Sequence, residues 1–253
     1  MTTTSKTTIS DDLLDGLRAL GLRLSSDALH ELLGKADPRS PRDLLAGLVA
    51  AERQEREQRN LAARTKAATL GGFSTLDRID WNHPRKIDRA LYEQLLTLDF
   101  VSRGENVLLR GPAGVGKTTL AQNLCLAGLQ RGLRVRFSTL AAALADLLKQ
   151  ESSPALERRL KRYIKPDLLV LDELGYLPAD SRSADLLYNI ISRRHEKQSI
   201  VITTNLPFKQ WGTVFPGAAC VGALVDRFAQ LCHVIDIEAD SWRQKASLRK
   251  PKT

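Results

Sequence analysis

The sequence predicts an α/β domain with a parallel sheet and helices on both of its faces, preceded by a small all-helical domain. From residue 105 onward, short β-rich runs alternate with helical patterns, which is typical of a parallel sheet. The first 66 residues show only the helical spacing of leucines. The runs expected as strands are residues 106–110, 134–138, 168–171, 199–203 and 234–237.

These patterns divide the chain into four parts. We expect a helical domain over residues 1–66, a linker over 67–82, an α/β domain over 83–248 and a basic tail over 249–253. The linker contains a Gly-Gly pair and little periodicity, and a helix over residues 88–98 precedes the first strand.

Three helices are expected in the helical domain. The first two, near residues 10–21 and 25–34, begin at serines and end at glycines, which are common capping and stop residues. The third begins at Ser40 and Pro41, a cap followed by proline in the first helical position. It becomes charged over residues 52–59, so this half must lie in solvent or on another molecule.

The composition excludes several classes of protein. With 43% hydrophobic and 26% charged residues, the chain is neither disordered, collagenous nor a coiled-coil rod. No apolar run approaches the ~20 residues of a membrane span, and the first ten residues lack a secretory signal. Cys125, Cys220 and Cys232 form no C-x-x-C pair and suit a reducing compartment. We therefore expect a cytoplasmic protein with no membrane partner.

The positive charge is concentrated in one block. Residues 106–165 hold 11 basic and 3 acidic residues, so this block accounts for +8 of the formal net charge of +9. A concentrated block favours a polyanionic partner such as nucleic acid. The alternative is a solvated face that keeps the protein soluble.

A complete G-x-x-x-x-G-K-[ST] motif follows the first expected strand and precedes a helix, as a phosphate-binding loop requires. Backbone N–H groups of such a loop can cradle phosphate oxygens, and the positive end of the next helix points at them. Lys117 can reach the β- and γ-phosphates of ATP, and the Thr118 hydroxyl can bind Mg²⁺. The expected ATP-binding residues are Gly111, Pro112, Ala113, Gly114, Val115, Gly116, Lys117, Thr118 and Thr119.

Two adjacent carboxylates, Asp172 and Glu173, follow an apolar run expected as a buried strand. Asp172 can hold Mg²⁺ directly or through water, and Glu173 can orient and polarise an attacking water. A helix cap is the alternative reading of such a pair. A small-molecule kinase has no need of the second acid, so the pair favours hydrolysis.

Three further residues are candidates for contact with the phosphates. Asn205 follows the fourth expected strand and can bind the γ-phosphate or the water if that strand lies beside the phosphate-loop strand. The alternative is a turn-forming asparagine before Leu206 and Pro207. Arg227 and Arg243 could stabilise the charge that develops in phosphoryl transfer, although most arginines form surface ion pairs.

The chain resembles the IstB family, the AAA+ helper ATPases of bacterial insertion-sequence transposition, and more distantly the DnaC-type helicase loaders. The resemblance extends over nearly the full length and is far more specific than the phosphate loop. The stretches that carry it are residues 67–70, 84–98, 105–118, 172–178, 191–196, 203–208, Trp211-Gly212 and Asp226-Arg227.

The resemblance implies an AAA+ P-loop NTPase fold with a five-stranded sheet and the P-loop strand at its centre. It implies a homo-oligomer with ATP between subunits, in which Arg227 acts in trans as an arginine finger. Asn205 matches the family's sensor 1, and Arg243 matches its sensor-2 arginine. Trp242 stands where relatives carry tyrosine, which leaves the geometry around Arg243 open. The resemblance also implies ATP-dependent binding and deformation of duplex DNA, and recruitment or activation of a transposase.

The resemblance also implies an extra helical element over residues 139–166, where related initiators and loaders bind nucleic acid. Its cations spread over more than one helix face, which suits contacts with phosphates rather than with bases. The candidates are Arg158, Arg159, Lys161, Arg162 and Lys165. A basic helix that packs on a neighbouring subunit's acids is the alternative, and the charged helix over residues 52–66 is a second DNA-binding candidate.

We therefore expect an ATPase that converts ATP to ADP and phosphate, and that serves a transposase on duplex DNA. A replicative helicase loader would share this motor and differ in the partner that residues 1–66 contact. A small-molecule kinase would be a monomer with a phosphorylated product. A passive architectural DNA binder would bind DNA without turnover.

Overall fold

The computed structural model describes residues 11–35, 41–175 and 180–242. The chain forms two compact units, residues 1–63 and 64–253. Within the described ranges, no helix combines the length and the apolar character that crossing a bilayer requires.

The first unit is helical, as the leucine spacing predicts. Its helices are α1 (Asp11–Ala19), α2 (Ser26–Lys35) and α3 (Pro41–Ala68), the last of which contains the boundary between the units. Gly21 follows α1 in the left-handed region, with a φ of 83°. The expected caps at Ser10 and Ser40 lie outside the described residues.

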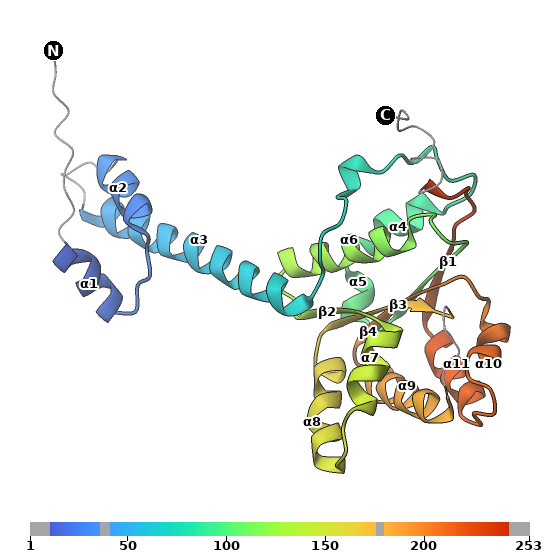
Figure 1. Cartoon of the computed structure of the whole chain (residues 1–253). Helices are drawn as coiled ribbons and strands as arrows, with labels where there is room; N and C mark the ends of the chain where they lie inside the picture. The colour runs from blue at the N-terminus through green and yellow to red at the C-terminus, as the bar shows by residue number, and fades with distance from the viewer. Residues whose placement is uncertain (1–10, 36–40, 176–179, 243–253) are drawn as a thin grey trace, which may run out of the picture. The chain divides into compact units, whose positions relative to one another are not determined.

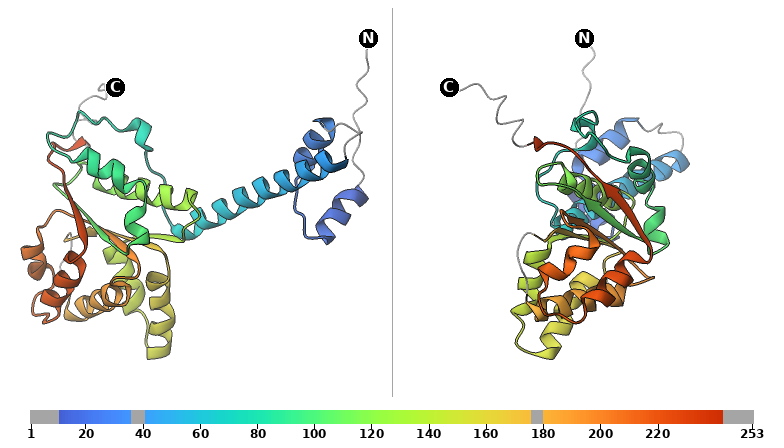
Figure 2. Two further views of the ribbon diagram at one scale, coloured as in Figure 1. Left: turned by 180° about the vertical axis from the view of Figure 1, so that it is seen from behind. Right: turned by 90° about the vertical axis from the view of Figure 1, so that its right-hand side faces the viewer.

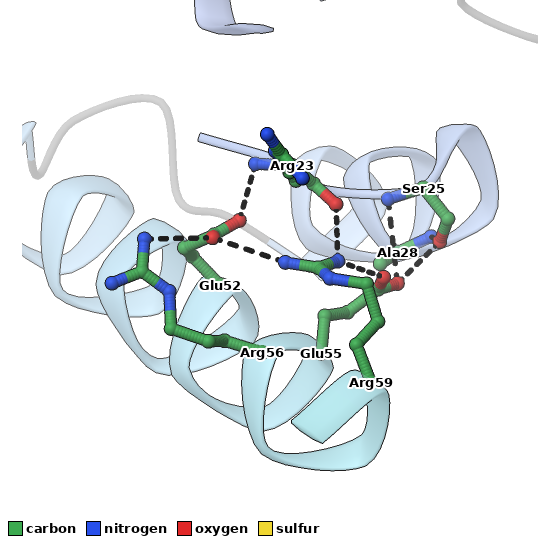
Figure 3. A network of polar contacts seen from close by, with 7 residues as sticks. All are labelled: Arg23, Ser25, Ala28, Glu52, Glu55, Arg56 and Arg59. Atoms are coloured by element: carbon green, nitrogen blue, oxygen red, sulfur yellow. Dashed lines mark hydrogen bonds and ion pairs between the residues drawn. The ribbon is translucent and has the colours of Figure 1, made fainter. Parts of the chain in front are cut away.

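The charged half of α3 packs against residues 23–25, the end of the segment that joins α1 to α2 (Figure 3). Glu52 is only 5% exposed, and its carboxylate accepts a 2.7 Å hydrogen bond from the Arg23 backbone N–H. Arg59 pairs with Glu52 and donates to the Arg23 carbonyl oxygen at 2.6 Å. Several of these charges therefore satisfy one another within the unit, so this helix is less suited to phosphate contacts than the sequence indicates.

The second unit is built on a five-stranded parallel sheet with the order β2-β3-β4-β1-β5. The strands are β1 (Asn106–Arg110), β2 (Val135–Thr139), β3 (Leu168–Leu174), β4 (Ser199–Thr204) and β5 (Cys232–Asp236). All five expected runs form strands. The expected central position of the phosphate-loop strand is wrong by one place, because β1 lies between β4 and β5 and β4 occupies the middle.

Helices cover both faces of the sheet (Figures 1 and 2). One face carries α6 (Lys117–Gln130), which packs on β1 to β4, and α7 (Leu140–Leu148) and α9 (Ser181–Arg194) contact the sheet on the other face. Apolar side chains of β1, β3 and β4 are fully buried between these layers, which explains why their sequence runs are continuously apolar. The other helices of this unit are α4 (Arg89–Leu95), α5 (Asp99–Ser102), α8 (Ser153–Ile164), α10 (Trp211–Val214) and α11 (Val221–Ala229).

The segment expected as a linker packs along α6 in the second unit. Leu70 is 4% exposed, and its carbonyl oxygen accepts a 2.9 Å hydrogen bond from the Gln122 side chain. The Asn123 side chain donates to the Ser74 carbonyl oxygen at 3.0 Å, just before a 3-10 turn, η1 (Leu76–Arg78). These contacts place residues 74–87 next to the phosphate loop.

Candidate functional site

The phosphate loop connects β1 to α6 and is held by close backbone packing. A Cβ atom on Gly111 would lie 2.3 Å from the Ile237 carbonyl oxygen, so only glycine fits there. Gly116 caps α6 with a φ of 98°, a conformation that side chains disfavour. The Lys117 amino group donates to the carbonyl oxygens of Gly111 and Pro112 at 2.7 and 2.6 Å. The loop and the start of α6 thus form a preorganised anion-binding turn.

Asp172 links the phosphate loop to two strands of the sheet. Its carboxylate is nearly buried, with 2% of the residue exposed. The Thr118 hydroxyl donates to its two oxygens at 3.1 and 3.0 Å, and the Thr203 hydroxyl donates to Oδ1 at 2.5 Å. These partners satisfy a buried charge that would otherwise be costly. A hydroxyl and a carboxylate side by side are the hard oxygen ligands that Mg²⁺ prefers.

Glu173 owes its orientation to an irregularity in β3. Successive side chains of a regular strand point to opposite faces of the sheet, which would separate Asp172 from Glu173. The β3–β4 pairing shifts register between Leu171 and Leu174, and Glu173 adopts a φ of 67°. Its backbone N–H donates to the Thr203 hydroxyl at 2.9 Å. Glu173 therefore lines the same cavity as Lys117 and Thr118.

That cavity has a volume of about 240 Å³ and lies beside the phosphate loop. One wall consists of residues 113–120 of the loop and α6, with Glu173 and Thr203 at the strand ends. The other wall is largely apolar and aromatic. Its residues are Ser74, Arg78, Ile79, Asp80, Trp81, His83, Pro84, Ile87 and Trp242.

Sequence reasoning missed this second wall, because residues 67–82 were expected to form a linker. The His83 and Trp242 rings meet edge to face with centroids 4.8 Å apart, and His83 Nε2 lies 2.9 Å from the Asp240 carbonyl oxygen. The Trp242 backbone N–H donates to the Gly114 carbonyl oxygen at 3.0 Å. Trp81 was the available signal, since a solvated linker has no use for a large aromatic side chain.

Asn205 and Arg227 are not among the residues that line this cavity. Asn205 is exposed directly after β4, and β4 pairs with β1, which is the condition for Asn205 to reach the phosphates. Arg227 lies on α11, where Nη1 donates to the Ser192 hydroxyl and the guanidinium covers the Tyr188 ring. Arg243 lies outside the described residues. The structure thus brings Lys117, Thr118, Asp172 and Glu173 together within one chain and leaves Arg227 apart from them.

The basic residues of α8 and of its C-cap, Lys165, fall into two groups. Four of the five candidates are exposed, namely Arg158, Lys161, Arg162 and Lys165. Arg159 instead forms an ion pair with Asp146 of α7, and the Tyr163 hydroxyl donates to the same carboxylate at 2.8 Å. The hydrogen bonds from Arg159 hold the pKa of Asp146 below its usual value. Arg159 therefore ties α8 to α7 through Asp146, whereas the other four cations are exposed.

The sequence matches known ATP-binding proteins. A family model described as IstB-like ATP binding protein matches residues 16–250. The chain is 36% identical over 233 residues to an insertion sequence IS21 putative ATP-binding protein of Pseudomonas aeruginosa, covering 92% of this chain and 88% of that protein. It is 32% identical over 201 residues to the corresponding IS5376 protein of Geobacillus stearothermophilus, covering 79% and 80% respectively.

Solved structures of replication proteins share the fold. The crystal structure of the DnaC helicase loader matches with a TM-score of 0.52 and 22% identity, over 62% of this chain and 98% of that one. AMPPCP-bound DnaA from Aquifex aeolicus matches with a TM-score of 0.55 and 22% identity, over 70% and 54% respectively. These likenesses show the AAA+ fold, and the sequence matches show that the chain belongs to the family of IstB-like ATP-binding proteins.

Proposed function

We propose that this protein is an ATPase that assembles on duplex DNA, remodels it, and recruits or activates a transposase. The observation that carries the proposal is the convergence of the phosphate loop, Thr118 and Glu173 on one cavity, with the Asp172 carboxylate hydrogen-bonded to Thr118. A loop that merely bound nucleotide would not need a second carboxylate held in a left-handed backbone conformation at that cavity.

Each residue has a role in hydrolysis that its position supports. Lys117 would leave its loop carbonyl groups to neutralise the β- and γ-phosphates, and Thr118 and Asp172 would hold Mg²⁺. Glu173 would orient and polarise the attacking water, because its side chain faces the cavity. The apolar wall around Trp81 would receive the base of ATP. Asn205 would contact the γ-phosphate or the water.

Two arginines would complete the site. Arg227 contacts Ser192 and Tyr188 of α9 and does not line the cavity of its own chain, which favours action in trans on ATP bound between subunits of a homo-oligomer. Arg243 would act in cis; in the sequence it directly follows Trp242, whose backbone N–H donates to the Gly114 carbonyl oxygen. Arginines in such positions stabilise the charge that develops on the transferring phosphoryl group.

DNA contact is proposed for α8. Its four exposed cations offer non-directional attraction to phosphates, so binding would be largely independent of sequence and sensitive to salt. A related fold, the replication initiator DnaA, was solved bound to AMPPCP and single-stranded DNA, with a TM-score of 0.52 and 18% identity over 70% of this chain and 59% of that one. Arg159 would contribute by holding α8 in place.

The partner is proposed from the relatives, whose names place them in insertion sequences. A transposase that contacts residues 1–66 is the partner expected there. A replicative helicase loader is the second candidate function, favoured by the structural likeness to the DnaC loader. Pull-down of the full chain with a transposase encoded in the same insertion sequence and with a replicative helicase separates the two.

The test of the ATPase proposal uses Glu173→Gln. This variant should bind ATP and duplex DNA normally but hydrolyse ATP slowly, so the protein–DNA complex should persist in gel-shift and phosphate-release assays. Lys117→Ala is the matched control, since it should lose ATP binding itself. Normal hydrolysis by Glu173→Gln would refute the assignment of the water-activating base. Electron microscopy with an ATP analogue, with and without duplex DNA, tests the assembly and the DNA path.

A further inference from the structure

Arg227 is held by two side chains that lie on one face of α9. Its Nη1 donates a hydrogen bond to the Ser192 hydroxyl, and its guanidinium carbon lies 4.9 Å from the centroid of the Tyr188 ring. Tyr188 and Ser192 are four residues apart, the spacing that places side chains on the same helix face. The Tyr188 ring contacts the flat face of the guanidinium, and the Ser192 hydroxyl binds one of its edges. Together the two contacts define the orientation of the guanidinium about two axes.

The helix that provides this support is itself firmly anchored. The Asp180 side chain caps α9 by accepting a 2.8 Å hydrogen bond from the Ser183 N–H. Leu187, Ile190 and Ile191 pack into the core with at most 1% exposure. α9 is therefore a rigid support of the kind that holds functional groups more precisely than a loop does.

Arg194 anchors the far end of α9. It is fully buried, and its guanidinium donates hydrogen bonds to five backbone carbonyl oxygens at the end of α8, in the segment before β3 and at the start of β4. The acceptors are the carbonyl groups of Tyr163, Ile164, Pro166, Asp167 and Ser199. Burial lowers the pKa of Arg194 to about 9, so the group remains protonated at neutral pH.

The contacts of Arg227 leave its positive charge available. Other arginines of this unit pair with acids, as Arg193 does with Glu157 and Arg110 with Asp236. Among the residues that the structure describes, no carboxylate forms an ion pair with Arg227. A ring face and a neutral hydroxyl attract a guanidinium without cancelling its charge. This is the arrangement expected of a cation that is oriented in advance for an anion arriving from outside the chain.

We propose that Tyr188 and Ser192 are positioning residues, which orient Arg227 toward the γ-phosphate bound by a neighbouring subunit. The inference rests on the proposed trans role of Arg227 and extends it to the helix that presents the finger. Because a finger stabilises charge that develops in the transition state, its orientation governs kcat more than ATP affinity. A displacement of about 1 Å at such a group can lower the rate about 100-fold.

Steady-state ATPase kinetics of the assembled protein with duplex DNA test the role of each contact. Tyr188→Leu and Ser192→Ala should each lower kcat about 10- to 100-fold with little change in the KM for ATP. Tyr188→Phe keeps the ring and Ser192→Thr keeps a hydroxyl, so both should retain most of the activity. Arg182→Ala, an exposed change on the same helix, is the control and should leave kcat unchanged.

A subunit-mixing experiment shows whether the effect passes through Arg227 in trans. Arg227→Ala subunits keep an intact site but donate no finger, whereas Glu173→Gln subunits donate a finger but hydrolyse slowly. Mixing the two should restore activity above that of either alone. Glu173→Gln subunits that also carry Tyr188→Leu should fail to restore it, and those that carry Tyr188→Phe should succeed.

Different results would contradict the trans role of Arg227 and the positioning role of Tyr188 and Ser192. If the mixture of Arg227→Ala and Glu173→Gln restores nothing, the trans role of Arg227 is wrong. If Tyr188→Leu donors restore activity as well as the parent donors do, the trans role stands and the positioning inference is wrong. A kcat that rises in Tyr188→Leu, or a loss of ATP affinity and thermal stability that matches the loss of rate, would also overturn the inference.

Discussion

Replacing Glu173 by glycine should remove hydrolysis and at the same time stabilise the fold relative to alanine. Glu173 is a non-glycine residue with a φ of 67°, held there by the bulge in β3 and by its N–H bond to Thr203. Glycine adopts this conformation without steric cost, whereas alanine does not. Both substitutions remove the carboxylate, so comparing them isolates the backbone contribution.

The expected difference follows from two opposing terms. A side chain in the left-handed region costs about 1–2 kcal/mol. Glycine also has more conformational freedom in the unfolded chain, which lowers the stability of the glycine variant by about 0.4–1 kcal/mol. The Glu173→Gly variant should therefore be about 0.5–1 kcal/mol more stable than Glu173→Ala. For a unit of about 150–250 residues, this raises the Tm by about 1–4 °C.

Thermal melts followed by circular dichroism, without nucleotide, measure this difference directly. Nucleotide must be omitted because a ligand that binds the native state adds its own stabilisation. Phosphate release measured in parallel should be equally low for both variants. An alanine variant that melts at or above the glycine variant would refute the claim that the backbone is strained at Glu173.

Three further predictions concern the phosphate loop, α8 and acid stability. Lys117→Ala should abolish ATP binding and ATP-dependent assembly, measured by calorimetry and light scattering; assembly with ATP that persisted would contradict the site assignment. Arg158→Glu should weaken binding to every DNA duplex and flatten the salt dependence of that binding. Arg159→Ala should instead lower the Tm, because it breaks the ion pair with Asp146. An unchanged salt slope for Arg158→Glu would show that Arg158 does not contact DNA phosphates. Hydrogen bonding from Arg103 lowers the pKa of Glu105 to about 2 from 4.5, so this contact stabilises the fold above pH 4.5 and is lost as the pH falls toward 2. Glu105→Gln should flatten the acid side of the stability curve in denaturant titrations, and an unaltered curve would contradict that contribution.

The sequence predicts those parts of the fold and site that depend on local patterns. Continuous apolar runs identify β1, β3 and β4 because both faces of these strands are buried. The phosphate loop is recognisable because its glycines meet local demands, such as the close approach of Gly111 to Ile237. The resemblance to the family predicts the five-stranded sheet. It also predicts β1 at the centre of the sheet, one position from where the structure has it.

The rest depends on contacts between distant segments. The bulge that turns Glu173 toward the cavity arises from β3–β4 pairing, which residue spacing does not reveal. Arg159 and Arg158 are neighbours of the same type, and only the approach of α7 places Asp146 beside one of them. The wall formed by Trp81, His83 and Trp242 requires the segment before β1 to meet the segment after β5.

The cavity wall that Trp242 and residues 74–87 form together has a consequence for when the pocket is completed during translation. The phosphate loop is synthesised early in the α/β unit, but the wall is complete only when Trp242, beyond β5, joins residues 74–87. A growing polypeptide with the loop alone offers phosphate contacts without a full pocket. We therefore expect nucleotide to bind more tightly to chains that already include Trp242, and such binding would stabilise them. The ATP-dependent assembly proposed above would then favour subunits in which Trp242 has joined residues 74–87.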